Sequence, residues 1–250
     1  MKTNMISLCL PDTVNEIISE CPGFTIARNV SDLLEMAGSN STNEWREVAY
    51  DVPEKGKVIE AMVCRVRNGI AVNYPDPYMR RRDPDCMVIA DDLPTDKPRF
   101  IDRYGYVFQH LRNATIDWLK TQDLCLFLFS AGVHGKGIGA VVVAPANAGF
   151  FALGLALLQG IHDPDQLPES FSPKSVIYVD PPFRHTHFNG KQIVAHHRSE
   201  SIYEMFSYNL YPGPSAKKGV YGILINLGEQ EKWVTAHCST VQIVTPYDNK

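Results

Sequence analysis

Short apolar runs bounded by turn residues alternate with amphipathic segments along most of this chain. Continuous apolar runs of strand length are typical of strands that are buried on both faces. The segment Val58–Val72 is different, because Asn68–Gly69 interrupts it with the strongest short-range signal for a hairpin between two strands. Further strands are expected at 86–91, 124–132, 175–182, 191–197, 219–228 and 233–245.

The amphipathic segments predict helices. Residues 10–40 predict two helices, the second capped by Asn29 or Ser31 and ended by Gly38. Further helices are expected at 101–120 and 199–210. Because strands and helices are mixed along the chain and several strands are fully apolar, the pattern predicts a mixed α/β domain.

The stretch Gly137–Ile161 contains no charged residue and is long enough to be tested as a membrane span. A proline and an asparagine interrupt it, and turn residues in the middle of an apolar run break a continuous span. We therefore expect a buried strand at 139–145, a turn at Ala146–Asn147 and a buried helix at 148–158, with no membrane association.

The composition is that of an ordinary globular chain. Hydrophobic residues make up 44% of the 250 residues and charged residues 21%, and a chain of this length favours one large domain over residues 1–250. The net charge of −4 argues against a general nucleic-acid binder, which usually has a basic excess. The six cysteines have no paired spacing and the N-terminus has no signal-peptide pattern, which favours reduced thiols and a cytoplasmic location.

An arginine-rich segment is the first candidate for binding chemistry. Arg80, Arg81 and Arg82 come shortly before the strand expected at 86–91. Guanidinium groups bind carboxylates and phosphates through paired hydrogen bonds, and loops at strand ends commonly carry sites. Taken alone, the segment fits a solvated charge cluster better, because neighbouring aspartates offset the arginines.

A lysine-rich turn is the second candidate, and a histidine is the third. Between Tyr211 and Gly219, prolines and glycines surround Lys217 and Lys218, and glycine lets a backbone approach a phosphate closely. The spacing is not that of a P-loop, and an exposed turn ahead of a strand explains the same residues when they are taken alone. His237 lies in the last expected strand and becomes a metal ligand only with partners.

Two pairs of histidines offer a different chemistry. His185 and His187 are two residues apart, which on a strand places both rings on one face, and His196 and His197 are adjacent. Histidines of this kind bind zinc, so a zinc-dependent hydrolase is one alternative. No carboxylate or cysteine at ligand spacing supports it.

Taken together, Arg82–Pro84, Lys217–Gly219 and His237–Ser239 resemble the phosphoenolpyruvate carboxykinase family. In that family an Arg-Ser-Pro segment precedes a strand, a glycine-rich turn ends in Lys-Lys-Gly, and an apolar segment leads to a His-Cys-Ser motif. The spacing from the second lysine to the histidine is similar to that in the ATP-dependent members. The resemblance is closest over residues 194–240, while the family's serine is an aspartate here and the turn carries an extra residue.

The resemblance implies a metal and substrate site. The implied catalytic residues are Lys217, Lys218 and His237, and the implied ligands of a divalent cation, Mn²⁺ or Mg²⁺, are Lys218 and His237. The implied substrate-binding residues are Arg82, with Arg81 as its alternative, Tyr211, Lys218 and Gly219. A lysine ligand must be neutral, which requires that the cation, burial or a neighbouring lysine lowers its pKa.

The reaction implied by the resemblance converts oxaloacetate and ATP or GTP into phosphoenolpyruvate, CO₂ and a nucleoside diphosphate. The implied fold is the mixed-sheet N-terminal domain of that family. The chain ends 13 residues after His237 without a P-loop, so we expect a substrate lobe that is inactive alone and that continues into a nucleotide-binding domain in the full-length protein. The alternative is a non-catalytic module that binds a small anionic metabolite, either a dicarboxylate or a phosphorylated compound.

Overall fold

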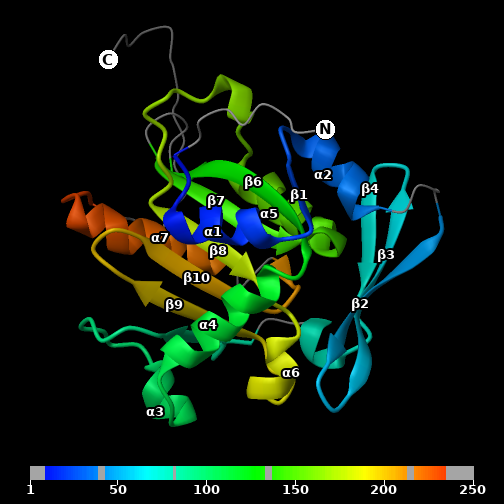
Figure 1. The fold of residues 1–250 in the computed structure, drawn as a ribbon, viewed down its shortest axis with the longest axis horizontal. Helices are drawn as coiled ribbons and strands as arrows, with labels where there is room; N and C mark the ends of the chain where they lie inside the picture. Colours follow the sequence, from blue (N-terminus) through cyan, green and yellow to red (C-terminus); the bar gives the residue numbers. More distant parts are fainter. Residues whose placement is uncertain (1–8, 39–42, 81–82, 133–136, 213–216, 235–250) are drawn as a thin grey trace, which may run out of the picture.

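The computed structural model describes residues 9–38, 43–80, 83–132, 137–212 and 217–234. Within these residues the strands form a seven-stranded mixed sheet and a three-stranded antiparallel sheet, so the protein is an α/β protein, as predicted (Figure 1). The strands of the large sheet, in spatial order, are β1 (Gly23–Ile26), β6 (Asp123–Ala131), β7 (Ile138–Pro145), β8 (Ser175–Val179), β10 (Tyr203–Tyr208), β9 (Ile193–Arg198) and β5 (Met87–Ile89). The strands of the small sheet are β2 (Trp45–Val52), β3 (Gly56–Val66) and β4 (Gly69–Asn73).

Strand direction brings distant parts of the sequence to one end of the large sheet. β7, β8 and β10 run parallel to one another, so their carboxyl ends lie at the same end. β9 is antiparallel to β10, and β5 is parallel to β9, so the amino end of β5 also lies there. In register, Val194 of β9 pairs with both Met87 of β5 and Ser207 of β10. The segment before β5 and the segment after β10 therefore meet the sheet at one end, which we call the β10 carboxyl end.

Helices cover both faces of the large sheet. One face packs against α1 (Asp12–Glu20), α3 (Phe100–Tyr104) and α4 (Phe108–Leu119), of which α1 and α4 cross the front of the sheet in Figure 1. The other face packs against α2 (Val30–Ala37), α5 (Gly149–Gln159) and α7 (Lys217–Gln230). Shorter helices are α6 (Phe183–His187), η1 (Pro77–Arg80), η2 (Ala146–Ala148) and η3 (Pro164–Gln166).

Burial on both faces explains the continuous apolar strands. In β6, Leu124, Leu126 and Leu128 pack toward α1 and α4, whereas Phe127 and Phe129 pack toward α5. A strand between two layers of helices has no polar face, so alternation disappears from its sequence. The small sheet packs into the core that contains α2, α5 and α7, where its side chains Val48, Tyr50, Ala61 and Val63 are buried.

Several predicted elements are confirmed. The predicted hairpin is present between β3 and β4, but its turn is at Arg67–Asn68, one residue before the predicted Asn68–Gly69, and Gly69 pairs with Val66 as the first residue of β4. Asn29 caps α2, with its side-chain oxygen accepting from the Asp32 N–H at 3.1 Å, and Gly38 ends this helix. The uncharged stretch 137–161 divides into β7, η2 and α5, as expected. Among the described residues, none of the helices combines the length and apolar character needed to cross a bilayer.

Residues 219–228, predicted as a strand, belong to α7, so that prediction is wrong. Val220, Ile223 and Leu227 are buried, and they recur at helical spacing. The run is short and rich in β-branched residues, so its sequence did not distinguish the spacing of a helix from that of a strand. Most of the strand predicted at 233–245 lies outside the described residues.

Residues 199–210, predicted as a helix, contain β10, so that prediction is also wrong. All six residues of β10 are buried between β8 and β9. Glu204 suggested a solvent-facing position, but its Oε1 accepts from Nη2 of Arg112 at 2.6 Å, which lets the carboxylate lie inside the protein. Residues 101–120 form two helices instead of one, because Gly105 ends α3 with a φ of 76°.

Candidate functional site

The structure describes four of the seven predicted site residues. Tyr211 follows β10, and Lys217, Lys218 and Gly219 are the first three residues of α7. The other three, Arg81, Arg82 and His237, lie outside the described residues, and their roles stay predictions.

α7 begins at the lysine pair, so the lysine-rich turn precedes a helix and not a strand as predicted. The N–H groups in the first turn of a helix lack partners within the helix, and the helix dipole adds partial positive charge there. Lysine in the first turn adds charge of the same sign, which disfavours the helix by itself but favours a bound anion. α7 has 14 residues, and the side chain of Lys218 is exposed at its beginning.

Gly219 is explained by packing. A Cβ on Gly219 would overlap Sδ of Met205 on β10 and would lie 3.6 Å from Cε1 of His196 on β9. Met205 is completely buried, so its side chain has little room to move. The Lys-Lys-Gly sequence therefore ends in glycine because α7 lies directly on the sheet at this point.

Tyr211 contacts a segment that is remote in sequence. The hydroxyl of Tyr74, just after β4, donates to the carbonyl oxygen of Leu210 at 2.7 Å. The rings of Tyr74 and Tyr211 meet edge to face with 5.8 Å between centroids. The backbone N–H of Tyr211 donates to Oδ1 of Asn209 at 3.0 Å, which closes a local turn after β10. The chain leading to the arginine-rich segment and the chain leading to the lysine pair are therefore in contact.

A buried ion cluster joins the small sheet to α6. The guanidinium of Arg184 is 1% exposed, and its Nε donates to both carboxylate oxygens of Glu60 on β3, at 2.9 and 3.2 Å. Its Nη1 donates to Oδ2 of Asp76 at 3.0 Å and to the carbonyl of Gly190. Nε2 of His185 also lies within hydrogen-bond distance of Glu60. Loss of one partner would leave an uncompensated buried charge, so the cluster holds these three parts of the chain together.

Asp76 links this cluster to η1. Its Oδ1 accepts the backbone N–H of Tyr78 at 2.8 Å. Burial alone would raise the pKa of Asp76, but the hydrogen bonds from Tyr78 and from the Arg184 guanidinium outweigh burial and lower this pKa. The carboxylate is therefore charged at neutral pH. It anchors η1, from which the chain continues into the arginine-rich segment.

Asp180 follows β8 at the β10 carboxyl end and is fully buried. Its backbone N–H donates to the carbonyl of Ser207 at 2.9 Å. In the part of the chain that the structure describes, neither carboxyl oxygen of Asp180 has a hydrogen-bond partner. Burial raises the pKa of Asp180 well above its ordinary value, which favours the neutral, protonated form of the carboxyl. A neutral carboxyl can donate a hydrogen bond, but it must lose its proton before it can bind a cation.

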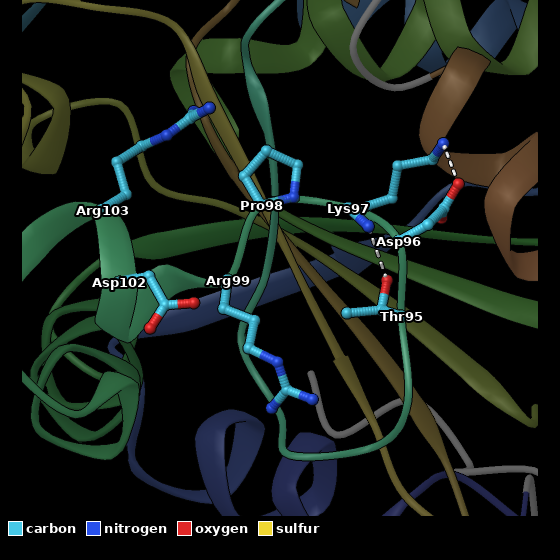
Figure 2. Close-up of a pocket in the computed structure, with 7 residues that line it drawn as sticks. All are labelled: Thr95, Asp96, Lys97, Pro98, Arg99, Asp102 and Arg103. Carbon is cyan, nitrogen blue, oxygen red and sulfur yellow. Dashed lines mark hydrogen bonds and ion pairs between the residues drawn. The ribbon is translucent and has the colours of Figure 1, made fainter.

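Two hollows open on the surface near β5. The one in Figure 2 is lined by residues 95–99, Asp102 and Arg103. Its three cations already have partners: Nζ of Lys97 lies 3.1 Å from Asp96, Arg99 lies 3.6 Å from Asp92, and Arg103 donates to the carbonyl of Asp85. The second hollow, of about 490 Å³, has Tyr78, Asp83, His187 and Lys191 among its lining residues. Two of these residues, Tyr78 and Asp83, flank the arginine-rich segment in the sequence.

The histidine pairs do not form a zinc site among the described residues. His185 and His187 lie on α6 and not on a strand, and His185 contacts Glu60. His196 and His197 are consecutive on β9, so they face opposite sides, where they contact Tyr203 and Glu204 respectively. No cluster of three potential metal ligands among His, Cys, Asp and Glu occurs in the described ranges.

The chain belongs to the family described as "Domain of unknown function (DUF4914)", whose model matches residues 10–250. No curated protein matches the chain. Because the family description assigns no activity, the function has to be inferred from the residues and their geometry.

The sequence patterns did not identify four residues of this region, Glu60, Tyr74, Asp180 and Arg184. A polar residue directly after a buried strand is a signal that could have found Asp180, because strand ends commonly carry sites. The pairing of Glu60 with Arg184 joins residues 124 positions apart, and nothing in the local sequence around either one indicates it.

Proposed function

We propose that this chain is the substrate- and metal-binding lobe of a phosphoenolpyruvate carboxykinase-like enzyme. The proposal rests on the motifs that contain Arg82, the Lys217–Lys218 pair and His237. Its substrate is a small dicarboxylate, oxaloacetate, and the phosphoryl group comes from a nucleotide, ATP or GTP, bound outside this lobe.

One observation carries the proposal. The segments that contain the first two motifs are far apart in sequence, and the hydrogen bond from Tyr74 to Leu210 joins residues 136 positions apart. A substrate site of the proposed kind needs this proximity, because the substrate carboxylate and the phosphoryl group must be held close together for transfer. The lysine pair in the first turn of α7 adds a position that favours an anion.

Each residue of the proposed site has a role that follows from its chemistry. Arg82 would hold the substrate carboxylate through two parallel hydrogen bonds, with Arg81 as its alternative. Lys217 would balance charge on the transferring phosphoryl group. Tyr211 would position the substrate beside them, and Gly219 lets α7 lie close enough to the sheet to present the lysines.

A divalent cation, Mn²⁺ or Mg²⁺, would be held by Lys218 and His237. Of these two, the described residues include only Lys218, whose side chain is exposed and therefore reachable by an ion. Imidazole suits such a cation, and the cation would supply Lewis-acid stabilisation of an enolate oxygen. Of the carboxyl groups described nearby, Glu60 is paired with Arg184, and burial favours the neutral form of Asp180, which does not bind a cation.

Titration calorimetry of the 250-residue chain tests the proposal. We expect Mn²⁺ to bind with one site, His237→Ala to abolish this binding, and oxaloacetate to bind more tightly with Mn²⁺ than without it. His110→Ala, which changes an exposed histidine on α4, is the matched control and should bind Mn²⁺ normally.

The same titration calorimetry distinguishes the proposed enzyme lobe from the alternative function. A non-catalytic module for small anions would bind oxaloacetate or inorganic phosphate equally well with and without Mn²⁺. The observation that favours this alternative is that α7 begins at the lysine pair, since the beginning of a helix binds an anion without a metal. Binding of Mn²⁺ that survives His237→Ala would contradict the proposed metal site.

A further inference from the structure

Tyr74 is a buried tyrosine that lies between two segments of the proposed site. It is 8% exposed and directly follows β4. Its hydroxyl donates to the carbonyl of Leu210, and its ring meets both Tyr211, at 5.8 Å between centroids, and Phe150, at 6.4 Å. One side chain therefore contacts the backbone that leads into Tyr211 and the ring of Tyr211 itself.

Tyr74 is held in place from the other side. Two residues further on, Asp76 accepts from the buried guanidinium of Arg184, which also binds Glu60. The Arg184 guanidinium is buried, whereas the Asp76 side chain is partly exposed, so their ion pair fixes the backbone two residues after Tyr74 to the interior of the protein. Burial of the Tyr74 hydroxyl raises its pKa, so the hydroxyl keeps its proton and remains a donor at physiological pH.

We propose that Tyr74 is the positioning residue for Tyr211 in the proposed anion site, and that the Arg184–Asp76 pair is its anchor. The identity of the anion rests on the proposed function, whereas the positioning of Tyr211 does not. A ring that is fixed in this way presents a rigid wall beside the anion, and fixing a contact before binding reduces the entropy lost on binding.

Tyr74→Phe tests the proposal, because it removes the hydroxyl and keeps the ring. Tyr50→Phe is the matched control. Tyr50 is 6% exposed and donates one hydrogen bond of 2.7 Å, to Asn147. Both variants lose one buried hydrogen bond, so their stabilities should fall by similar amounts. Asp76→Asn is a second variant, which keeps the Tyr74 side chain and weakens its anchor.

The first measurement is hydrogen exchange of the amide of Tyr211, followed by mass spectrometry of peptides that contain residues 209–211. We expect faster exchange in Tyr74→Phe and in Asp76→Asn, and unchanged exchange in Tyr50→Phe. Exchange in Tyr74→Phe that equals exchange in Tyr50→Phe would overturn the positioning role, whatever the chain binds.

The second measurement is the affinity for oxaloacetate in the presence of Mn²⁺. We expect Tyr74→Phe to bind oxaloacetate up to about fivefold more weakly, because Tyr211 must then be ordered on binding, and we expect Tyr50→Phe to bind it normally. Equal affinities of Tyr74→Phe and the unmodified chain would overturn the inference that Tyr74 serves the site. If the unmodified chain binds no oxaloacetate while the exchange result holds, the proposed function is wrong and the positioning role stands.

Discussion

Replacing Gly219 by alanine sets two physical effects against each other. In a helix, alanine is favoured over glycine by about 1 kcal/mol, so the change should stabilise α7 if nothing else responds. At Gly219, however, the new Cβ would overlap Sδ of Met205, which is completely buried. Forcing extra volume into a packed core costs about 1–3 kcal/mol. With a mid-range cost of about 2 kcal/mol, Gly219→Ala should lower the free energy of unfolding by about 1 kcal/mol.

Gly222, one turn further along α7, is the matched control. A Cβ there would lie 3.4 Å from Cε1 of His196, which is an ordinary contact. Gly222→Ala should therefore raise the free energy of unfolding by up to about 1 kcal/mol, since only the helix preference changes. The two glycines lie on the same helix, so the opposite signs isolate the contact with Met205.

A double-mutant cycle in urea measures the overlap directly. Met205→Ala removes the overlapping atoms and by itself should cost about 2–5 kcal/mol. In that background, Gly219→Ala should become stabilising, which gives a coupling energy of about 2 kcal/mol between the two positions. A stabilising Gly219→Ala in the unmodified chain, or additive effects of the two changes, would refute the conclusion that packing requires this glycine.

Three further outcomes are expected. Glu60→Gln should lower the free energy of unfolding in urea by about 3 kcal/mol, because the buried Arg184 would keep only the partly exposed Asp76 as a charged partner. The exposed Glu47→Gln should change it by less than about 1 kcal/mol. Equal effects would argue against the buried cluster. Asp180→Asn removes a carboxyl whose pKa is raised by burial, so the unmodified chain should lose stability as pH rises from the unfolded-state pKa of about 4 toward the folded-state pKa, and the variant should not. Between pH 5 and pH 8, the free energy of unfolding in urea should therefore rise for the variant relative to the unmodified chain. A difference that does not depend on pH would contradict a raised pKa of Asp180. The 250-residue chain should form no phosphoenolpyruvate from oxaloacetate, ATP and Mn²⁺ in an enzyme-coupled assay, and turnover would show that this chain also supplies the nucleotide site.

Much of the fold was predictable because it depends on neighbours in the chain. The hairpin between β3 and β4, the cap at Asn29 and the division of 137–161 into β7, η2 and α5 each follow from a local pattern. In such cases turn chemistry, capping and periodicity act within a few residues, and tertiary contacts agree with them.

The two wrong elements both depend on distant residues. β10 is a strand because β8 and β9 flank it and because Arg112 neutralises Glu204 inside the protein. α7 is a helix because Val220, Ile223 and Leu227 fill the core on one face of the sheet. Local propensity is weak in both segments, so packing decided the outcome.

By itself, the sequence determined the α/β class, most of the buried strands, and the arginine, lysine and histidine motifs from which the function is proposed. Only the tertiary structure decided that Tyr74 contacts Tyr211, that Arg184 pairs with Glu60 and Asp76, and that Gly219 lies against Met205. The physical reason is that motifs and periodicity are written in neighbouring residues, whereas a buried contact depends on which distant side chains the packed sheets and helices bring together.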